Sequence, residues 1–548
     1  MKSFFRTHFT LAIFILCPTS LLAQESQWQK NMDEGKHHRA QGRYAEAENS
    51  YRAAIAAAEV FDQEDFHLAL SLNSLGTLYY DKAHYVEAEP LFQRALSIFE
   101  KIGETGSERL VVCLNNLAQV YQAEGRLTEA ERLLKRALSD AEKTLGADHP
   151  EFARSERQLA NLYTVQGDYK RAEPLYRLAL SIQKKTLGPE HLIVATGLND
   201  LAQLLSLQGR YAEAEEMHRS ALNIRQKQLR KGDPNIASSL DNLARQLALQ
   251  AKYGEAEPLF RQALSIRRSA LGSEHPDVAT SLRSLADLCT YQARYLEAVV
   301  FYKQALSILK RALGDGHIDV GITMNDLACL YRLLGRLAEA ESLFQQAIAL
   351  YQNPPEKNQL EAAISLGNLA AIHQDQHRYS KAEDLYQQAL LVLEQALGKD
   401  HPHVASMNKR LASLYSQRGS EEKAELLYRQ VLATEEKSLG ADHPHVASTL
   451  HDLARLCTKQ HRYAEAERLY QRALNIREDK LGADHPDLAD TLHAYALLLR
   501  ETNRKSQAKA LDANAKQILA KNSSLKTANQ TIHVTELESA AKAWKAQR

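Results

Sequence analysis

A short segment recurs through almost the whole chain at a nearly constant spacing. The sequence Gly-Arg-Tyr-Ala-Glu-Ala-Glu begins at Gly42 and again at Gly209, and ten variants of it occur elsewhere. The second alanine of the segment, or its equivalent, is found at Ala47, Ala88, Ala130, Ala172, Ala214, Ala256, Ala298, Ala340, Ala382, Ala424, Ala466 and Ala508. The first step is 41 residues long and the other ten are 42. A fixed period of this length indicates a repeat architecture in which each unit is one supersecondary element.

Each unit carries two segments with the periodicity of an amphipathic helix. In the fourth unit we expect the first helix from about Pro150 to Gln166 and the second from about Tyr169 to Thr186. Gly167 separates them, where a tight turn needs a residue that tolerates positive φ. Each unit alone leaves an apolar face uncovered, so neighbouring units must stack to form one continuous core. The sequence therefore predicts an all-α superhelical solenoid of about twelve helix pairs.

The repeat array is expected over residues 24–520, between two short segments. Residues 1–23 have a positive start and an apolar run, Leu11–Cys17, which is typical of a cleavable secretory signal. The run is shorter than the ~20 residues of a membrane-spanning helix, and an uncleaved anchor is the alternative. We expect an exported protein, periplasmic or secreted, with no membrane insertion after cleavage. Residues 521–548 are expected to form a C-terminal tail with one short helix at most.

Charge and cysteine content narrow the possible partners. The chain has 68 basic and 68 acidic residues, and this balance gives no cationic excess for nucleic acid. Cys289 and Cys329 are the cysteines in neighbouring units, but we expect repeat spacing to hold them beyond the ~7 Å between Cα atoms that a disulfide tolerates. Cys289 and Cys457 occupy the position of a core tyrosine, so we expect both to be buried.

Several residues resemble a known repeat family. The spacing of the tetratricopeptide signature is found at Leu75-Gly76, Tyr79, Ala88, Phe92 and Ala95. The 42-residue period and the segment Leu114-Asn115-Asn116-Leu117-Ala118 resemble the kinesin light chain variety of this repeat. The resemblance implies a right-handed superhelix whose concave surface, lined by the first helix of each unit, accepts peptide segments. Kinesin light chains have a coiled coil before their repeats, whereas this chain has a signal-like segment, so the resemblance implies a secreted bacterial relative.

The residues expected to face this groove lie two positions before or after a core leucine of each first helix. They are Asn73, Asn115, Gln119, Arg157, Asn161, Asn199, Gln203, Asp241, Arg245, Arg283, Asn325, Lys409 and Arg455. Amide side chains can hold the backbone of an extended peptide, and arginine can bind carboxylates in a bidentate manner. Because basic residues outnumber acidic ones here, we expect a mildly acidic partner. The alternative is that these are ordinary solvated helix positions.

A histidine recurs in the loop between units. It is found at His149, His191, His275, His317, His401, His443 and His485, whereas Asp233 and Gln359 occupy the same position in two other units. A zinc site needs ligands that converge to about 2 Å, but packed helices lie ~8–10 Å apart. Capping of the following helix explains the same residues, so we expect no metal site.

The chain carries none of the common catalytic or phosphate-binding motifs. The residues outside the repeats are too few for a separate catalytic domain, which would need ~100 residues. We therefore expect a non-catalytic protein–protein interaction scaffold without a cofactor, which binds an extended peptide or a partner's surface. One alternative is an envelope polysaccharide or polymer binder, for which Tyr80 is one of few candidate aromatic platforms. Another is a secreted effector that binds a host protein.

Overall fold

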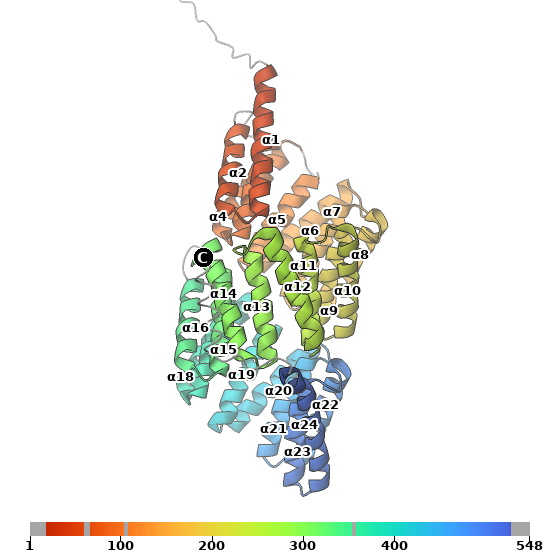
Figure 1. Ribbon diagram of the computed structural model, residues 1–548, viewed down its shortest axis with the longest axis vertical. Coiled ribbons are helices and arrows are strands. Elements are labelled where there is room, and N and C mark those ends of the chain that lie inside the picture. Colours follow the sequence, from red (N-terminus) through yellow and green to blue (C-terminus); the bar gives the residue numbers. More distant parts are fainter. Residues whose placement is uncertain (1–17, 60–65, 104–107, 353–357, 528–548) are drawn as a thin grey trace, which may run out of the picture.

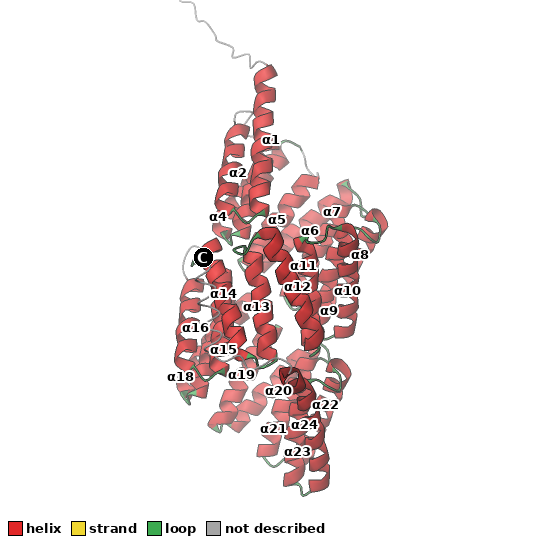
Figure 2. Ribbon diagram, viewed as in Figure 1, coloured by secondary structure: helices red, strands yellow, loops and turns green. Residues whose placement is uncertain are grey.

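The computed structural model describes residues 18–59, 66–103, 108–352 and 358–527, and these contain 24 helices and no strand (Figures 1 and 2). Odd-numbered helices are the first helices of the units and even-numbered helices the second. Units 1–6 comprise α1 (Pro18–Ala40), α2 (Tyr44–Ala58), α3 (Phe66–Asp81), α4 (Tyr85–Lys101), α5 (Glu108–Ala123), α6 (Leu127–Thr144), α7 (Pro150–Val165), α8 (Tyr169–Leu187), α9 (Leu192–Leu207), α10 (Tyr211–Gln228), α11 (Pro234–Leu249) and α12 (Tyr253–Leu271).

Units 7–12 repeat the same pattern. They comprise α13 (Pro276–Tyr291), α14 (Tyr295–Leu313), α15 (Ile318–Leu333), α16 (Leu337–Gln352), α17 (Gln359–Asp375), α18 (Tyr379–Leu397), α19 (Pro402–Arg418), α20 (Glu421–Ser438), α21 (Pro444–Lys459), α22 (Tyr463–Leu481), α23 (Pro486–Glu501) and α24 (Lys505–Thr527). The predicted all-α array of about twelve helix pairs is confirmed. Of the predicted signal, residues 1–17 lie outside the described residues, and so does the tail from residue 528.

A continuous apolar core joins the two helices of each unit. In unit 4, Ala172, Tyr176 and Ala179 of α8 are buried, as the sequence predicted. Alanine at these positions lets the helix axes approach closely, and the aromatic ring fills the space beside it. The approach is close elsewhere too, because a Cβ added to Gly76 would lie 3.0 Å from the ring of Phe92.

The first helices of consecutive units pack directly against one another. The side-chain amide of Asn115 in α5 donates to the Oγ of Ser155 in α7 over 2.9 Å, and both side chains are fully buried. Equivalent contacts join other neighbouring odd-numbered helices. We call the surface formed by the odd-numbered helices, on the side away from their even-numbered partners, the inner wall.

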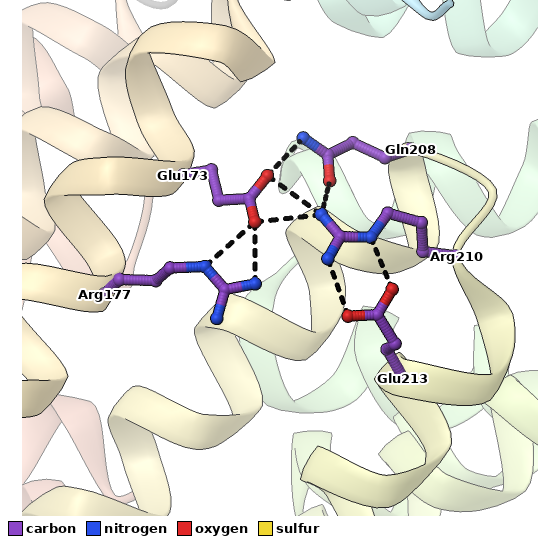
Figure 3. A network of polar contacts seen from close by, with 5 residues as sticks. All are labelled: Glu173, Arg177, Gln208, Arg210 and Glu213. Atoms are coloured by element: carbon purple, nitrogen blue, oxygen red, sulfur yellow. Dashed lines mark hydrogen bonds and ion pairs between the residues drawn. The ribbon is translucent and has the colours of Figure 1, made fainter.

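Arginine–glutamate networks fix several units on the one before them. Arg210, in the turn between α9 and α10, pairs with Glu173 of α8 at 2.9 Å and with Glu213 of α10 at 2.6 Å (Figure 3). Gln208 and Arg177 complete the hydrogen bonding of Glu173. Burial acts to raise the pKa of Glu173, but these partners outweigh it and the pKa is lowered. The same arrangement recurs around Arg126, Arg294 and Arg462.

The turn between the two helices of each unit contains one residue with positive φ, which we call the turn residue. In units 1–6 it is always small: Gly42, Ala83, Gly125, Gly167, Gly209 and Ala251. In units 7–12 it is Ala293, Gly335, His377, Gly419, His461 and Asn503. The backbone conformation is the same throughout, so the difference in size has another cause.

Successive turns of the superhelix stack on each other. A Cβ added to Gly167 would lie 2.7 Å from the Cδ of Pro402, and one added to Gly209 would lie 2.7 Å from the Cδ of Pro444. A Cβ added to Gly42 would lie 2.9 Å from the ring of His275, and in Figure 1 α13 follows α1 along the long axis. Each turn residue of units 1, 4 and 5 thus meets the loop that begins unit 7, 10 or 11. Six units complete one turn, and we call this line of contact the seam.

Candidate functional site: the inner wall and the seam

Histidines of the inter-unit loops bridge two helix ends at the seam. The Nδ1 of His401 accepts from the backbone N–H of His403, which caps the start of α19. Its Nε2 lies 2.9 Å from the carbonyl oxygen of Val165, the last residue of α7. His443 makes the same two contacts, with the N–H of His445 and, at 3.0 Å, with the carbonyl of Leu207. One neutral imidazole therefore satisfies orphan groups at the end of one helix and the start of another.

The predicted capping role is confirmed in the other units that carry the histidine. The rings of His149, His191, His275, His317 and His485 each accept from the backbone N–H two residues later, and Asp233 does the same with its carboxylate. Unit 9 is the exception, because Asn358 precedes α17 without a side-chain cap. His191 lies in the first turn of the superhelix and is exposed, whereas His401 and His443 are buried.

Burial sets the protonation state of the seam histidines. It lowers the pKa of His401 and of His443 to about 4, and the backbone hydrogen bonds with Val165 and Leu207 oppose this effect only partly. The neutral form is the one that both contacts require, since Nδ1 accepts and Nε2 donates. Both histidines are therefore neutral at pH 7.

At the junction between units 2 and 8 the seam is looser. The ring of His317 lies near the backbone of Asp81, the last residue of α3, but its buried Nε2 forms no hydrogen bond of regular geometry in the described part of the chain. A cleft of about 800 Å³ adjoins it, with Lys82 and His84 on one side and Lys310 and Gln346 on the other.

Three residues predicted to face the groove do not. Asn115, Asn199 and Asp241 are buried, so the prediction is wrong for them. Each contacts a serine of the next first helix 40 residues later, as Asn199 does with Ser239. Asp241 also forms a buried ion pair with Arg267 of α12. The position two before the core leucine points at the neighbouring helix rather than at a ligand, because consecutive first helices pack along this edge.

Asn73 and Asn325 are half-buried at the same edge. Asn73 accepts from the amide of Asn116, and Asn325 accepts from Ser365. Their side-chain oxygens are therefore occupied by neighbouring first helices.

Two of the predicted arginines are paired on the inner wall. Arg157 lies 2.8 Å from Asp200, and Arg283 lies 2.9 Å from Asp326. Each aspartate belongs to the next unit. Asp200 directly follows the predicted residue Asn199, and Asp326 directly follows Asn325. The excess of arginine that suggested an acidic partner is therefore reduced.

The remaining predicted residues lie along the inner wall with different exposure. Gln203, Arg245 and Arg455 are exposed. Gln119, Asn161 and Lys409 are half-buried. Arg455 also lines a hollow of about 280 Å³ together with Asp452 and Lys459.

Sequence reasoning missed a row of exposed apolar side chains on the same helix face. They lie at the C-terminal ends of four consecutive first helices, at Leu207, Leu249, Tyr291 and Leu333, with exposed fractions of 45%, 38%, 57% and 59%. Each stands four residues after a polar or thiol position such as Gln203 or Arg245, and residues four apart share a helix face. We call these four side chains the apolar stripe. Their 42-residue spacing was a signal in the sequence that could have identified them.

An acidic pair lies beside the stripe. Burial raises the pKa of Asp287 to about 6, and the nearby carboxylate of Asp326 adds to the effect. The hydroxyl of Tyr302 donates to Asp287 and opposes it.

The four cysteines of the described ranges are free thiols, and the two predicted to be buried are so. Cys113, Cys289 and Cys457 are buried, and Cys329 is half-buried on the inner wall. Within the described ranges no cluster of three or more His, Cys, Asp or Glu side chains is arranged to hold a metal. No described helix is long and apolar enough to cross a membrane.

The described geometry, with paired helices in a 42-residue register, agrees with the family comparison. The tetratricopeptide repeat family matches residues 31–101, 110–184, 151–227, 235–311, 292–353, 361–437, 430–479 and 446–519. The chain belongs to the tetratricopeptide repeat family. Such repeats form scaffolds that generally mediate protein–protein interactions. No curated protein matches the chain.

Three solved structures are similar to parts of this tetratricopeptide chain. Two are crystal structures of nearly identical tetratricopeptide-like repeats of a putative kinesin light chain from Podospora anserina, one of them a single-substitution variant. Both are 30% identical and cover 37% of this chain and 96% of their own, with TM-scores of 0.33 for the variant and 0.32 for the other. The third is BtubC (BKLC) from P. vanneervenii, which is 22% identical and covers 46% of this chain and 93% of its own, with a TM-score of 0.34.

Proposed function

We propose that this protein is a non-catalytic scaffold that binds an extended segment of a partner protein along the inner wall of units 5–8. The apolar stripe is the observation that supports this most directly. Four large apolar side chains that are 38–59% exposed recur at the same place in four consecutive units, and a row of exposed apolar side chains supports an interaction site.

The spacing of the stripe suggests what the segment looks like. Neighbouring packed helices are ~8–10 Å apart, and an extended chain advances ~3.3 Å per residue. A bound strand would therefore pass one unit about every three residues. We expect an apolar side chain at about every third position of the segment.

Polar groups beside the stripe would hold the backbone of the segment. Gln203 offers both a donor and an acceptor, and it stands one helical turn before Leu207. Arg245 stands in the same relation to Leu249 and would meet a carbonyl or a carboxylate of the ligand. Acidic residues in the partner would meet this arginine, which is exposed.

A displayed library of random 15-residue peptides tests the proposal. Peptides selected on the unmodified chain are then titrated against a variant with Leu207→Ser, Leu249→Ser and Leu333→Ser. If each leucine contributes about 1.4 kcal/mol, the loss amounts to roughly tenfold in affinity per leucine. The matched control replaces three similarly exposed leucines of even-numbered helices by serine, namely Leu178, Leu391 and Leu426.

Equal affinity of the selected peptides for both triple variants would refute binding at the stripe. Circular dichroism of both variants at matched concentration shows whether they are folded. Because all six leucines are exposed, we expect both to keep the stability of the unmodified chain within ~0.5 kcal/mol per site.

Export is a separate proposal that rests on residues 1–23. The positive start at Lys2 and the apolar run Leu11–Cys17 support it. N-terminal sequencing of the protein recovered from the envelope and from the medium tests it. A mature start at Gln24 would support cleavage, and an intact Met1 in both fractions would refute it.

A further inference from the structure

We propose that the stacked turns enclose the inner wall, so that its partner is a single extended chain that enters from an open end of the superhelix, whereas helices and folded domains are excluded. This inference rests on the proposed function, since it names the physical form of the partner. It concerns access to the wall, whereas the proposed function concerns affinity for it.

The tightness of the seam is the first argument. At Gly167 and Gly209 the gap to the next turn has no room even for one added carbon. The imidazoles of His401 and His443 close the same junctions with hydrogen bonds to α7 and α9. A hydrogen bond from Lys170 to the carbonyl of Lys437 adds a third link between turns. No lateral slot remains at these junctions through which a folded partner could reach the wall.

The width of the bore is the second argument. Six first helices complete one turn, and neighbouring helix axes lie ~8–10 Å apart. Six axes in a ring at that spacing lie about 10 Å from its centre. A helix with its side chains has a radius of ~5–6 Å, which leaves a bore of at most about 10 Å in width. One extended strand fits this width, whereas a helix, at ~10–12 Å across, does not.

The course of the apolar stripe is the third argument. Leu207 belongs to unit 5, whose turn residue Gly209 meets the loop that begins unit 11. Leu249 belongs to unit 6, and its backbone forms a hydrogen bond with His485 in the loop that begins unit 12. Tyr291 and Leu333 belong to units 7 and 8, and no unit within residues 18–527 stacks on the turns of these two units. The stripe therefore passes from units that a later turn covers to units that no described unit covers, so a strand on the stripe has access from that side.

The looser junction beside His317 does not alter this conclusion. Its cleft of about 800 Å³ has the size of a small-molecule pocket. A folded domain is far larger, with a radius of gyration of ~13 Å for 100 residues.

Cys329 provides a reporter on the inner wall. It is half-buried, and the other three described cysteines are buried. In the full chain with Cys17→Ser, the modification of Cys329 is followed by mass spectrometry with three reagents. These are N-ethylmaleimide, a maleimide on a linear polyethylene glycol chain, and a maleimide on a small folded domain.

Opening the seam supplies the decisive comparison. The variant Gly167→His and Gly209→His places at the seam the residue that units 9 and 11 carry naturally at the same turn position. The control variant Gly335→His and Gly419→His makes the same change where nothing lies within 4 Å of an added Cβ. Both variants impose the same backbone strain, so they differ only at the seam.

We expect the small and the linear reagents to modify Cys329 in the unmodified chain, and the folded domain to give no product in the same time. The seam variant should admit the folded domain, and the control variant should not. Three results would overturn the proposal: a folded domain that reacts with the unmodified chain, a linear reagent that fails where the small one succeeds, or two variants that behave alike. The modification of Cys329 is measured without the selected peptides. The peptide titration can therefore refute binding at the stripe without refuting the enclosure of the inner wall, and the reverse also holds.

Discussion

The imidazole of His401 joins the end of α7 to the start of α19, two helices whose contacting residues are 236 positions apart. Its Nε2 lies 2.9 Å from the carbonyl oxygen of Val165, and its Nδ1 accepts from the N–H of His403 over 3.0 Å. The last carbonyls of a helix and the first N–H groups of another lack intrahelical partners. A single side chain serves both, and it orients the two helix dipoles head to tail.

Replacing the seam histidines by asparagine separates their two roles. Asparagine is a good helix cap, but it is too short to span the seam. We expect His401→Asn with His443→Asn to lower the free energy of unfolding by about 1–3 kcal/mol per site, because a buried carbonyl loses its donor. Urea denaturation followed by circular dichroism measures this. The control is His149→Asn with His191→Asn in the first turn, where the change should stay within ~0.5 kcal/mol per site; equal losses would contradict the bridge.

Acid should weaken the seam over a defined range of pH. The pKa of His401 and of His443 is about 4 in the folded chain, below the ordinary value of 6.5. Their contribution to stability is therefore complete above pH 6.5 and is lost as the pH falls to 4. The difference in urea midpoint between the unmodified chain and the His401→Asn, His443→Asn variant should shrink across this range. A difference that is constant from pH 7 to pH 4 would show that these histidines do not titrate as stated.

Glu156 should destabilise the chain as the pH rises. Burial raises its pKa to about 7, and its Oε2 has no hydrogen-bond partner in the described part of the chain. The group favours folding below its ordinary pKa of 4.5, and this contribution is lost as the pH rises through 7. Glu156→Gln should therefore raise the free energy of unfolding at pH 8 by roughly 1–3 kcal/mol. At pH 4.5 the two chains should unfold together, and a variant less stable at pH 8 would refute the assignment.

Because the turn residues have positive φ, we expect a substitution to glycine to stabilise the chain and a substitution of glycine by alanine to destabilise it. His461 has a φ of 61°, which costs an L-residue about 1–2 kcal/mol. His461→Gly should therefore raise the melting temperature, and Gly419→Ala, in open space, should lower it by a similar amount. Gly209→Ala should cost more than Gly419→Ala, because its Cβ meets Pro444 as well. Equal costs of the two alanine substitutions would contradict the stacking of turns.

The sequence determined the fold because the period repeats the same local information twelve times. In unit 4 the predicted limits of both helices, α7 and α8, agree with the structure to within one residue. Local signals were sufficient here, since a small turn residue, a capping histidine and alternating small and large apolar residues recur in most units.

The predicted inner-wall residues were less reliable for a geometric reason. A position two before the core leucine lies at the border between the inner wall and the neighbouring first helix. The serine that Asn199 contacts is Ser239, and this 40-residue pairing of a polar residue with a small hydroxyl recurs in several units. A search for paired columns would have assigned these positions to the interface between units.

The seam was not predicted from the sequence because the residues that meet there, such as His401 and Val165, are 236 positions apart. The histidines were correctly predicted to cap helices, but one ring nitrogen was left without a role. The small turn residues of units 1, 4 and 5 were the available clue, since an added Cβ at Gly42, Gly167 or Gly209 would meet the loop that begins a unit one turn later.

The identity of the turn residues also limits how this protein can lengthen by gene duplication. A third turn built by copying units 7–12 after unit 12 would stack on the turn residues His377, His461 and Asn503. Their side chains would occupy the positions that Pro402 and Pro444 fill against the glycines of the first turn. Copies of units 1–6 would meet no such obstacle. Descendants with more repeats should therefore have gained them near the N-terminus or in the middle of the array, with the last six units kept as its end.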